Sequence, residues 1–198
     1  MWVCIAIHVL IDAATMVLTV LTTPDGFSKI PVPTLSALIT AVYAGINEEV
    51  TDRAIPLAVM MRNKPTSRRI RLSALVSTLV FSLLHAVNIL QGQSVPDTIA
   101  QIIFAAGMGL FFAVVYLRTG SILLTIVIHT LHDYGAYFVL SFDATEASPI
   151  VTLLSLAAQY LPFVLGILML RRKHHPAIID TWSRIWPEAA DEQADRSL

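Results

Sequence analysis

Six apolar stretches, each long enough to cross a bilayer, limit the folds that this chain can adopt. A membrane-spanning helix needs about 20 mainly apolar residues, whereas a barrel strand needs about 10 with alternating polarity. The stretches have the helical length, and only 14% of the 198 residues are charged, too few for the surface of an ordinary soluble domain. The sequence therefore predicts an all-α, polytopic transmembrane helix bundle with spans at roughly 2–22, 34–61, 71–91, 97–117, 121–142 and 149–170.

Positively charged residues between these stretches predict the orientation of the bundle. They cluster after the second, fourth and sixth stretches, whereas acidic residues predominate in the loops at the other side. Because short loops rich in Lys and Arg stay in the cytoplasm, we expect both termini to be cytoplasmic (N-in, C-in). The basic residues concerned are Arg62, Lys64, Arg68, Arg69, Arg71, Arg118, Arg171, Arg172 and Lys173.

The two ends of the chain carry different expectations. The first stretch lacks the basic start of a signal peptide and runs past the usual length of its apolar region, so a membrane helix is expected there. Residues 1–173 are expected to form a single transmembrane bundle, followed by a polar cytoplasmic tail at 174–198. The i, i+4 spacing of Trp182 and Trp186 leaves a short interfacial helix open, but a solvated tail is favoured.

Net charge and cysteine content exclude some classes of partner. The formal net charge is −1, which gives no general attraction to nucleic acid. Cys4 is the single cysteine, so an internal disulfide and a multi-cysteine metal cluster are both excluded.

Acidic and imidazole side chains inside the apolar stretches point to a site. A charged group at bilayer depth costs at least about 2.5–3.5 kcal/mol on insertion scales, so each is a candidate for function. At ~1.5 Å per residue, Glu48 and His85 each lie ~21 Å from the cytoplasmic end of their span. By the same measure, His129 and Asp133 lie ~14 and ~20 Å above the start of theirs. Three helices thus bring such groups to within about one to two turns of the same level, which predicts one shared site.

Helical spacing predicts how these groups face one another. Residues four apart share a helix face, so Glu49 can pair with Arg53, and His129 with Asp133. Glu48 lies ~100° around the helix from Glu49 and can point into a cavity instead. Two close carboxylates beside one cation favour different ionisation behaviour, which suits a general base and a held partner. We expect Glu48 to be the base; a purely structural Arg–Glu staple is the less favoured alternative.

The remaining polar residues in the spans receive lesser roles. Asn88 shares a helix face with His85, three residues earlier, and is expected to contact the site residues without taking part in the reaction. His132 lies beside the site face and is assigned the same supporting role. His8 and Asp12 lie nearer the start of the first span, where structural or dimer packing is favoured. Phe81 is expected to pack without taking part in chemistry.

Three short motifs resemble a known family. "EEVTDR" matches EExxxR, "FSLLH" matches FxxxH, and "HTLHD" matches HxxxN/D, in that order on successive predicted helices. This set resembles the CPBP family of CAAX proteases and bacteriocin-processing enzymes, also called Abi, which includes the type II CAAX-prenyl endopeptidases. The resemblance covers roughly residues 35–140. The motif residues are Glu48, Glu49, Arg53, Phe81, His85, His129 and Asp133.

Two positions depart from the family pattern. Members commonly have an aromatic residue before the motif arginine and glycine after it, where this chain has Asp52 and Ala54. The third motif ends in Asp133 where the eukaryotic type II enzyme has asparagine, and this is a common bacterial variant. As a third acid, Asp52 is expected to perturb Glu48, its i+4 neighbour, or the local packing.

The resemblance implies an intramembrane endopeptidase. By analogy, Glu48 or Glu49 would activate the attacking water, and His85 would orient that water or shuttle its proton. His129 with Asp133 would stabilise the oxyanion or complete a metal site, and the motif arginine would hold the second glutamate. Peptide hydrolysis needs a base, a positioned water and an oxyanion donor, and the residues supply all three types.

Whether a metal takes part is left open by the sequence. A water-bearing zinc held by three protein ligands is chemically reasonable, but the compact HExxH pattern is absent. A metal-free, glutamate-activated water is slightly favoured. A divalent metal such as zinc would take its ligands from Glu48, Glu49, His85, His129 and Asp133.

Substrate, partners and rival functions are also left open. The expected partners are membrane lipid and a peptide or membrane-protein substrate: a CAAX-like C-terminus, a bacteriocin leader or a similar segment. Bacterial-looking loops make a prenylated native substrate less favoured and indicate the plasma membrane of a bacterium or archaeon. A homo-oligomer stays open. The rivals are a non-proteolytic scaffold, immunity or regulatory protein with the same fold, and a proton-coupled transporter, which the absence of an internal repeat disfavours.

Overall fold

Helices make up nearly all of the chain that the structure describes. The structure is a computed structural model that describes residues 1–24, 26–28, 35–62, 65–142 and 148–187. No strand occurs among these residues, and the all-α prediction is confirmed. The elements are α1 (Trp2–Thr22), α2 (Leu35–Glu49), the π-helical turn η1 (Val50–Ala54), α3 (Ile55–Arg62), α4 (Ser67–Leu84), the 3₁₀ helix η2 (His85–Gln91), α5 (Val95–Thr119), α6 (Ile122–Leu140), α7 (Pro149–Met169), the 3₁₀ turn η4 (Arg172–His174) and α8 (His175–Ile185).

Five helical segments in the described part of the chain are long and apolar enough to cross a membrane. They are α1, α4 with η2, α5, α6 and α7. The remaining expected span, 34–61, corresponds to the continuous helical run of α2, η1 and α3. This run falls outside the five because it carries four charged residues within six positions. The bundle therefore consists of apolar helices packed around one charged helical run.

Serine N-caps and a glycine at a helix C-terminus mark the ends of several helices. The side chains of Ser94 and Ser148 accept hydrogen bonds from backbone N–H groups in the first turns of α5 and α7, which satisfies donors that have no partner within a helix. α5 ends at Gly120, whose φ of 67° lies in the left-handed region that glycine adopts without strain. These local signals fix the helix ends.

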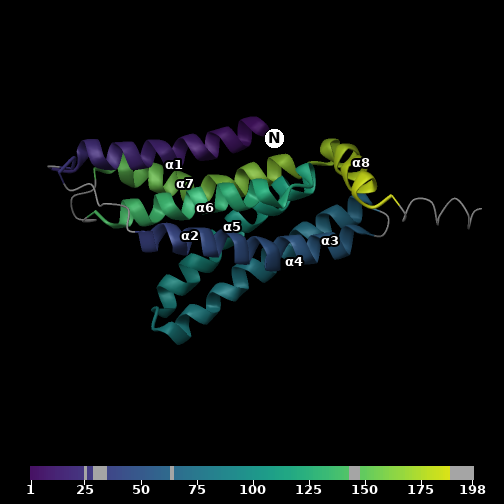
Figure 1. Cartoon of the computed structure of the whole chain (residues 1–198), viewed down its shortest axis with the longest axis horizontal. Helices are drawn as coiled ribbons and strands as arrows, with labels where there is room; N and C mark the ends of the chain where they lie inside the picture. The colour runs from purple at the N-terminus through teal and green to yellow at the C-terminus, as the bar shows by residue number, and fades with distance from the viewer. Residues whose placement is uncertain (25, 29–34, 63–64, 143–147, 188–198) are drawn as a thin grey trace, which may run out of the picture.

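α5 lies at the centre of the packing and contacts both α4 and α7 (Figure 1). α1 covers α6 and α7, while α2 lies against α6. The fully buried side chains of Phe111 and Phe112 on α5 belong to the main hydrophobic cluster. The charged run is therefore held between α6 on one side and α4 on the other.

Two glycines let the helices that carry the motifs approach closely. A Cβ at Gly45 would lie 2.4 Å from Oγ1 of Thr130, so α2 and α6 are nearly in backbone contact there. A Cβ at Gly109 on α5 would lie 3.0 Å from the ring of Phe81 on α4. Small residues at such crossings are typical of helix packing in membranes. Both contacts lie within about two helical turns of motif residues and bring their helices together.

The expectation of a solvated tail is wrong for the part of it that the structure describes as helix. α8 packs against α4 and α5, and its Trp182 is buried, with the indole Nε1–H donating to the carbonyl of Leu117 at 2.9 Å. Ile178 and Trp182 are four residues apart and share one helix face, so burying that face stabilises the helix. Residues 188–198 lie outside the described residues.

The start of α1 and helix α8 lie at the same end of the bundle (Figure 1). This agrees with an arrangement in which the start of α1 and helix α8 are on one side of the membrane. The assignment of that side to the cytoplasm stays a prediction from the basic loops, as does the boundary between bundle and tail at residue 173.

Candidate active site in the helix bundle

A fully buried ion pair lies behind the residues that line the site. Glu49 and Arg53 are both 0% exposed, and Oε1 of Glu49 lies 3.3 Å from a terminal guanidinium nitrogen of Arg53. The guanidinium carbon lies 3.5 Å from the ring centroid of Phe81 and 5.7 Å from that of Phe112. A carboxylate and two aromatic faces thus replace water around this cation. The predicted i, i+4 pairing is confirmed, and Phe81 packs against the cation as well as filling space.

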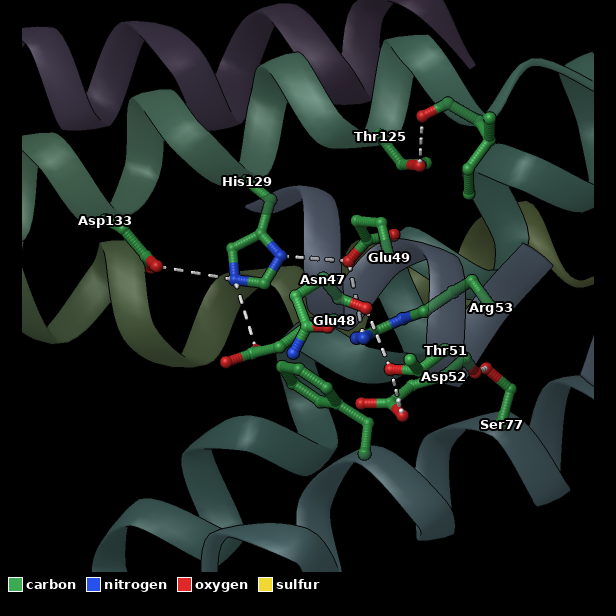
Figure 2. Close-up of polar contacts among 12 residues, drawn as sticks. Asn47, Glu48, Glu49, Thr51, Asp52, Arg53, Ser77, Thr125, His129 and Asp133 are labelled. Carbon is green, nitrogen blue, oxygen red and sulfur yellow. Dashed lines mark hydrogen bonds and ion pairs between the residues drawn. The ribbon is translucent and has the colours of Figure 1, made fainter. Parts of the chain in front are cut away.

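The helix changes its winding directly after the two glutamates. Residues 50–54 form a π-helical turn, a feature often found at functional sites. The hydroxyl of Ser77 on α4 donates to the backbone carbonyl of Asp52 at 2.6 Å, so the wide turn is tied to the neighbouring helix. The buried carboxylate of Asp52 accepts from the Thr51 hydroxyl at 2.9 Å. Asp52 therefore takes part in local packing within the turn (Figure 2).

His129 on α6 connects the buried pair to the other acids (Figure 2). Its Nδ1 lies 2.9 Å from Oε1 of Glu49. Because the Glu49 carboxylate paired with Arg53 is an acceptor, Nδ1 carries the proton and donates it. On the opposite side of the ring, Nε2 lies 3.8 Å from Oε2 of Glu48 and 3.6 Å from Oδ2 of Asp133. The predicted pairing of His129 with Asp133 is confirmed.

Glu48 differs from its neighbour because it reaches a cavity. Its side chain is 33% exposed, and it lines a cavity of about 430 Å³ together with His85, His129 and Asp133. The four groups come from three stretches of helix, as the depth arithmetic predicted. Glu49 and Arg53 lie behind this lining. Two successive carboxylates therefore have different surroundings, one held in the bundle and one facing an open volume.

His85 begins the 3₁₀ helix η2, where it faces the same cavity. Its Nδ1 lies 2.9 Å from the carbonyl oxygen of Phe81, which can only accept, so Nδ1–H is the donor and Nε2 is left available. Asn88 is not part of the cavity lining; its amide donates to the side chain of Gln101 at 2.8 Å, and Gln101 lines the cavity.

A second polar cluster on the cavity was missed in the sequence. Nδ1 of His132 lies 3.0 Å from Oδ2 of Asp12, and Nε2 of His8 lies 3.5 Å from the same oxygen. Asp12 and His132 line the cavity, while His8 is buried behind them. His132 therefore pairs with α1 and does not support His129 directly. The signal was present: Asp12 and His132 lie at similar helical heights, ~15 and ~18 Å.

The arrangement of donor atoms bears on metal binding. Among the described residues, a group of at least three His, Cys, Asp or Glu ligand atoms within 4.8 Å of one another occurs at His8, Asp12 and His132. Among the described residues, the five ligands expected from the motifs do not form such a group, although Nε2 of His129 lies 3.8 Å from Oε2 of Glu48 and 3.6 Å from Oδ2 of Asp133. A metal at the motif residues stays a prediction, and no step below passes through one.

The fold and the site define a class: polytopic membrane proteins whose helix core holds acids and imidazoles around one cavity. Within it, this chain belongs to the Rce1-like family, since the family model described as Type II CAAX prenyl endopeptidase Rce1-like matches residues 30–135, more than half of the chain. The resemblance expected from the motifs is confirmed, and the match spans all of the motif residues. Comparisons with the curated proteins and with the solved structures found no match.

Family membership and the apolar helices together give the general nature of the protein. It is a multi-pass membrane protein of an intramembrane CAAX endopeptidase family, and this family implies a protease. The catalytic type, the residues that carry it and the substrate are matters for proposal.

Proposed function

We propose that this protein is an intramembrane endopeptidase in which Glu48 activates water for attack on a peptide bond of a membrane-associated protein or peptide. One observation carries the proposal. Of two successive glutamates, Glu49 is fully buried and held by Arg53 and His129, whereas Glu48 reaches a cavity that His85 also lines. A general base must reach its water, and Glu48 alone of the pair meets this condition.

The two histidines support complementary roles in the hydrolysis. Glu48 accepts a proton from the water as its oxygen bonds to the scissile carbonyl carbon. Nδ1 of His85 is bonded to the Phe81 carbonyl, so Nε2 is the atom that can orient this water. The proton then passes to the leaving amide nitrogen, by way of Glu48 or His85, and the carbon–nitrogen bond breaks.

His129 is suited to stabilise the negative charge that develops on the carbonyl oxygen. Its Nδ1 is anchored on Glu49, so its Nε2 is held towards the cavity between Glu48 and Asp133. When the ring carries both protons, Nε2–H donates to the oxyanion without needing to reorganise, and preorganised donors of this kind contribute strongly to acyl-transfer catalysis. Arg53 acts indirectly, by holding Glu49.

The substrate that this proposal favours is a short extended segment entering from the membrane. The cavity wall combines the polar groups with apolar side chains such as Phe104, Met108 and Leu140, which suits a chain that carries apolar side chains or a lipid. A CAAX-like C-terminus, a leader peptide and a membrane-protein segment are the classes to test.

Cleavage assays in proteoliposomes test the proposal. Anchored peptides of the three classes are incubated with wild type, Glu48→Ala and His85→Ala, and products are identified by mass spectrometry. Asp180→Asn, which removes an exposed acid on α8, is the control. Wild type and control should cleave at equal rates, and each site variant should lose about 10²–10⁴-fold. Cleavage at equal rates in all four proteins would defeat the proposal, and no cleavage by wild type would favour a non-proteolytic role.

A further inference from the structure

We propose that His8, Asp12 and His132 bind a divalent transition-metal ion of the zinc class between α1 and α6. This site is separate from the Glu48 group but opens on the same cavity. It is built by helices that meet along one face, and its ligands come from positions 120 residues apart in the chain.

The spacing of the donor atoms fits a four-coordinate ion. Metal–nitrogen and metal–oxygen bonds of about 2.0–2.1 Å at tetrahedral angles place neighbouring ligand atoms about 3.3 Å apart. The measured separations from Oδ2 of Asp12 are 3.0 Å to His132 and 3.5 Å to His8. One ligand atom from each of the three residues lies within 4.8 Å of the others, so only small side-chain adjustments are needed to surround an ion.

His8 supplies an independent reason to expect a ligand. It is 1% exposed, and among the described residues neither ring nitrogen has a hydrogen-bond partner. Its ring packs edge-on against Phe111 with centroids 5.1 Å apart, so one face of its surroundings is apolar. A buried polar group without a partner is costly, and a metal bond from Nε2, the nitrogen nearest Asp12, removes that cost for this nitrogen.

The charges around Asp12 point the same way. Within the described residues, its ion-pair contacts are with His8 and His132 alone, in contrast to Glu49, which has Arg53. Two imidazoles and one carboxylate form a donor set that suits zinc and related ions, and three protein ligands leave one position open. Because Asp12 and His132 line the cavity, that open position faces the volume where water and substrate would lie.

Metal binding to the full chain, purified in detergent without a polyhistidine tag and stripped with chelator, tests the inference directly. Co²⁺ is added for its visible d–d absorption, and bound Zn²⁺ is counted by elemental analysis after gel filtration. Wild type is expected to bind about one ion per chain with four-coordinate Co²⁺ bands. At a hundred times Kd, Zn²⁺ should raise its melting temperature by about 5–10 °C.

Matched variants locate the ion. Asp12→Asn and His132→Gln should lose the Co²⁺ bands and the Zn²⁺-dependent shift. His175→Gln, which removes a histidine that is also 1% exposed but lies on α8, should keep both. Glu48→Gln should also keep both, because it belongs to the other group. If one α1–α6 variant does not fold in chelator, the other gives the answer.

The opposite pattern overturns the inference. Failure of wild type to bind a stoichiometric ion, or full binding by Asp12→Asn or His132→Gln, would remove the site. Loss of binding in Glu48→Gln with retention in Asp12→Asn would move the ion to the motif residues. None of these readouts depends on peptide cleavage, so they are independent of the proposed protease activity.

Discussion

The cavity has two polar walls that balance charge differently. On the wall formed by α2 and α6, Glu49 lies behind the cavity lining, where it is neutralised by Arg53 of η1 and bonded to His129. On the wall formed by α1 and α6, Asp12 meets only His8 and His132 in the described part of the chain. In the first wall, Oε1 of the buried Glu49 carboxylate has both a cation and a hydrogen-bond donor. The second wall holds a carboxylate and imidazoles without a permanent cation.

Helix α6 connects the two walls. His129 and His132 are three residues apart, and they turn towards α2 and α1 respectively. A single helix can therefore serve a permanently paired cluster and one that offers ligand atoms. On the two proposals made above, buried charge at membrane depth would serve function in two ways: by fixing a catalytic geometry, or by leaving a site that an ion completes.

The largest stability loss is expected from Arg53→Met. This substitution keeps apolar contact with Phe81 but leaves the fully buried Glu49 without its cation. Removing one partner of a buried ion pair costs about 3–5 kcal/mol. Thermal unfolding in detergent should show this loss, and adding Glu49→Gln to the same chain should restore much of it. A double variant as unstable as the single one would show that the pair is not the source of the effect.

A smaller loss is expected when the approach of α2 to α6 is obstructed. In Gly45→Ala, the added Cβ would lie 2.4 Å from the Thr130 hydroxyl and 3.2 Å from the Ile126 carbonyl oxygen. The Thr130 side chain must then turn away or α2 and α6 must move apart, which would shift His129 relative to Glu49. Overpacking of this kind costs about 1–3 kcal/mol. Thr130→Ala in the same chain should relieve part of it. Unchanged unfolding and cleavage in Gly45→Ala would contradict the close contact.

When no metal is present, a substitution in the wall on α1 should reduce stability less than Arg53→Met does. In chelator, Asp12→Asn keeps an oxygen that can accept from His132, so we expect a loss of about 1–2 kcal/mol in the free energy of unfolding. This is smaller than the loss for Arg53→Met, because no permanent cation is left unpaired. A loss in chelator as large as that of Arg53→Met would erase the contrast between the walls.

The smallest effect is expected at Asp52. Asp52→Asn retains the acceptor for the Thr51 hydroxyl and does not touch the backbone carbonyl bonded by Ser77. Unfolding should change by less than about 1 kcal/mol, and cleavage should stay within a few-fold of wild type. A loss of cleavage comparable to that of Glu48→Ala would instead restore the expectation that this acid perturbs Glu48.

Helical arithmetic predicted the bundle and the first wall because span length and depth are set by rise per residue. The 80-residue separation of Glu49 and His129 was no obstacle, since their predicted depths differ by only about one helical turn. The π-helical turn was not predicted, although residue 56 is a proline and has no N–H for the Asp52 carbonyl, which accepts from the Ser77 hydroxyl instead. Height along a helix also does not say which helices are neighbours, so Asp12 and His132 were not joined.

α8 was not the favoured expectation for a related reason. The i, i+4 spacing of its tryptophans left a short helix open, but it does not say that Ile178 and Trp182 are buried against α4 and α5. Which helices a segment packs against depends on tertiary contacts, which the local sequence does not indicate.

The most direct test of the central claim compares Glu48→Gln with Glu49→Gln for both cleavage rate and melting temperature. Glu48→Gln should lose about 10²–10⁴-fold in cleavage rate with a melting temperature within about 2 °C of wild type. Glu49→Gln should lower stability by about 3–5 kcal/mol, because Arg53 is left buried without its carboxylate. A Glu48→Gln variant that cleaves at the wild-type rate, or that loses the stability expected for Glu49→Gln, would contradict the division of roles between the two glutamates.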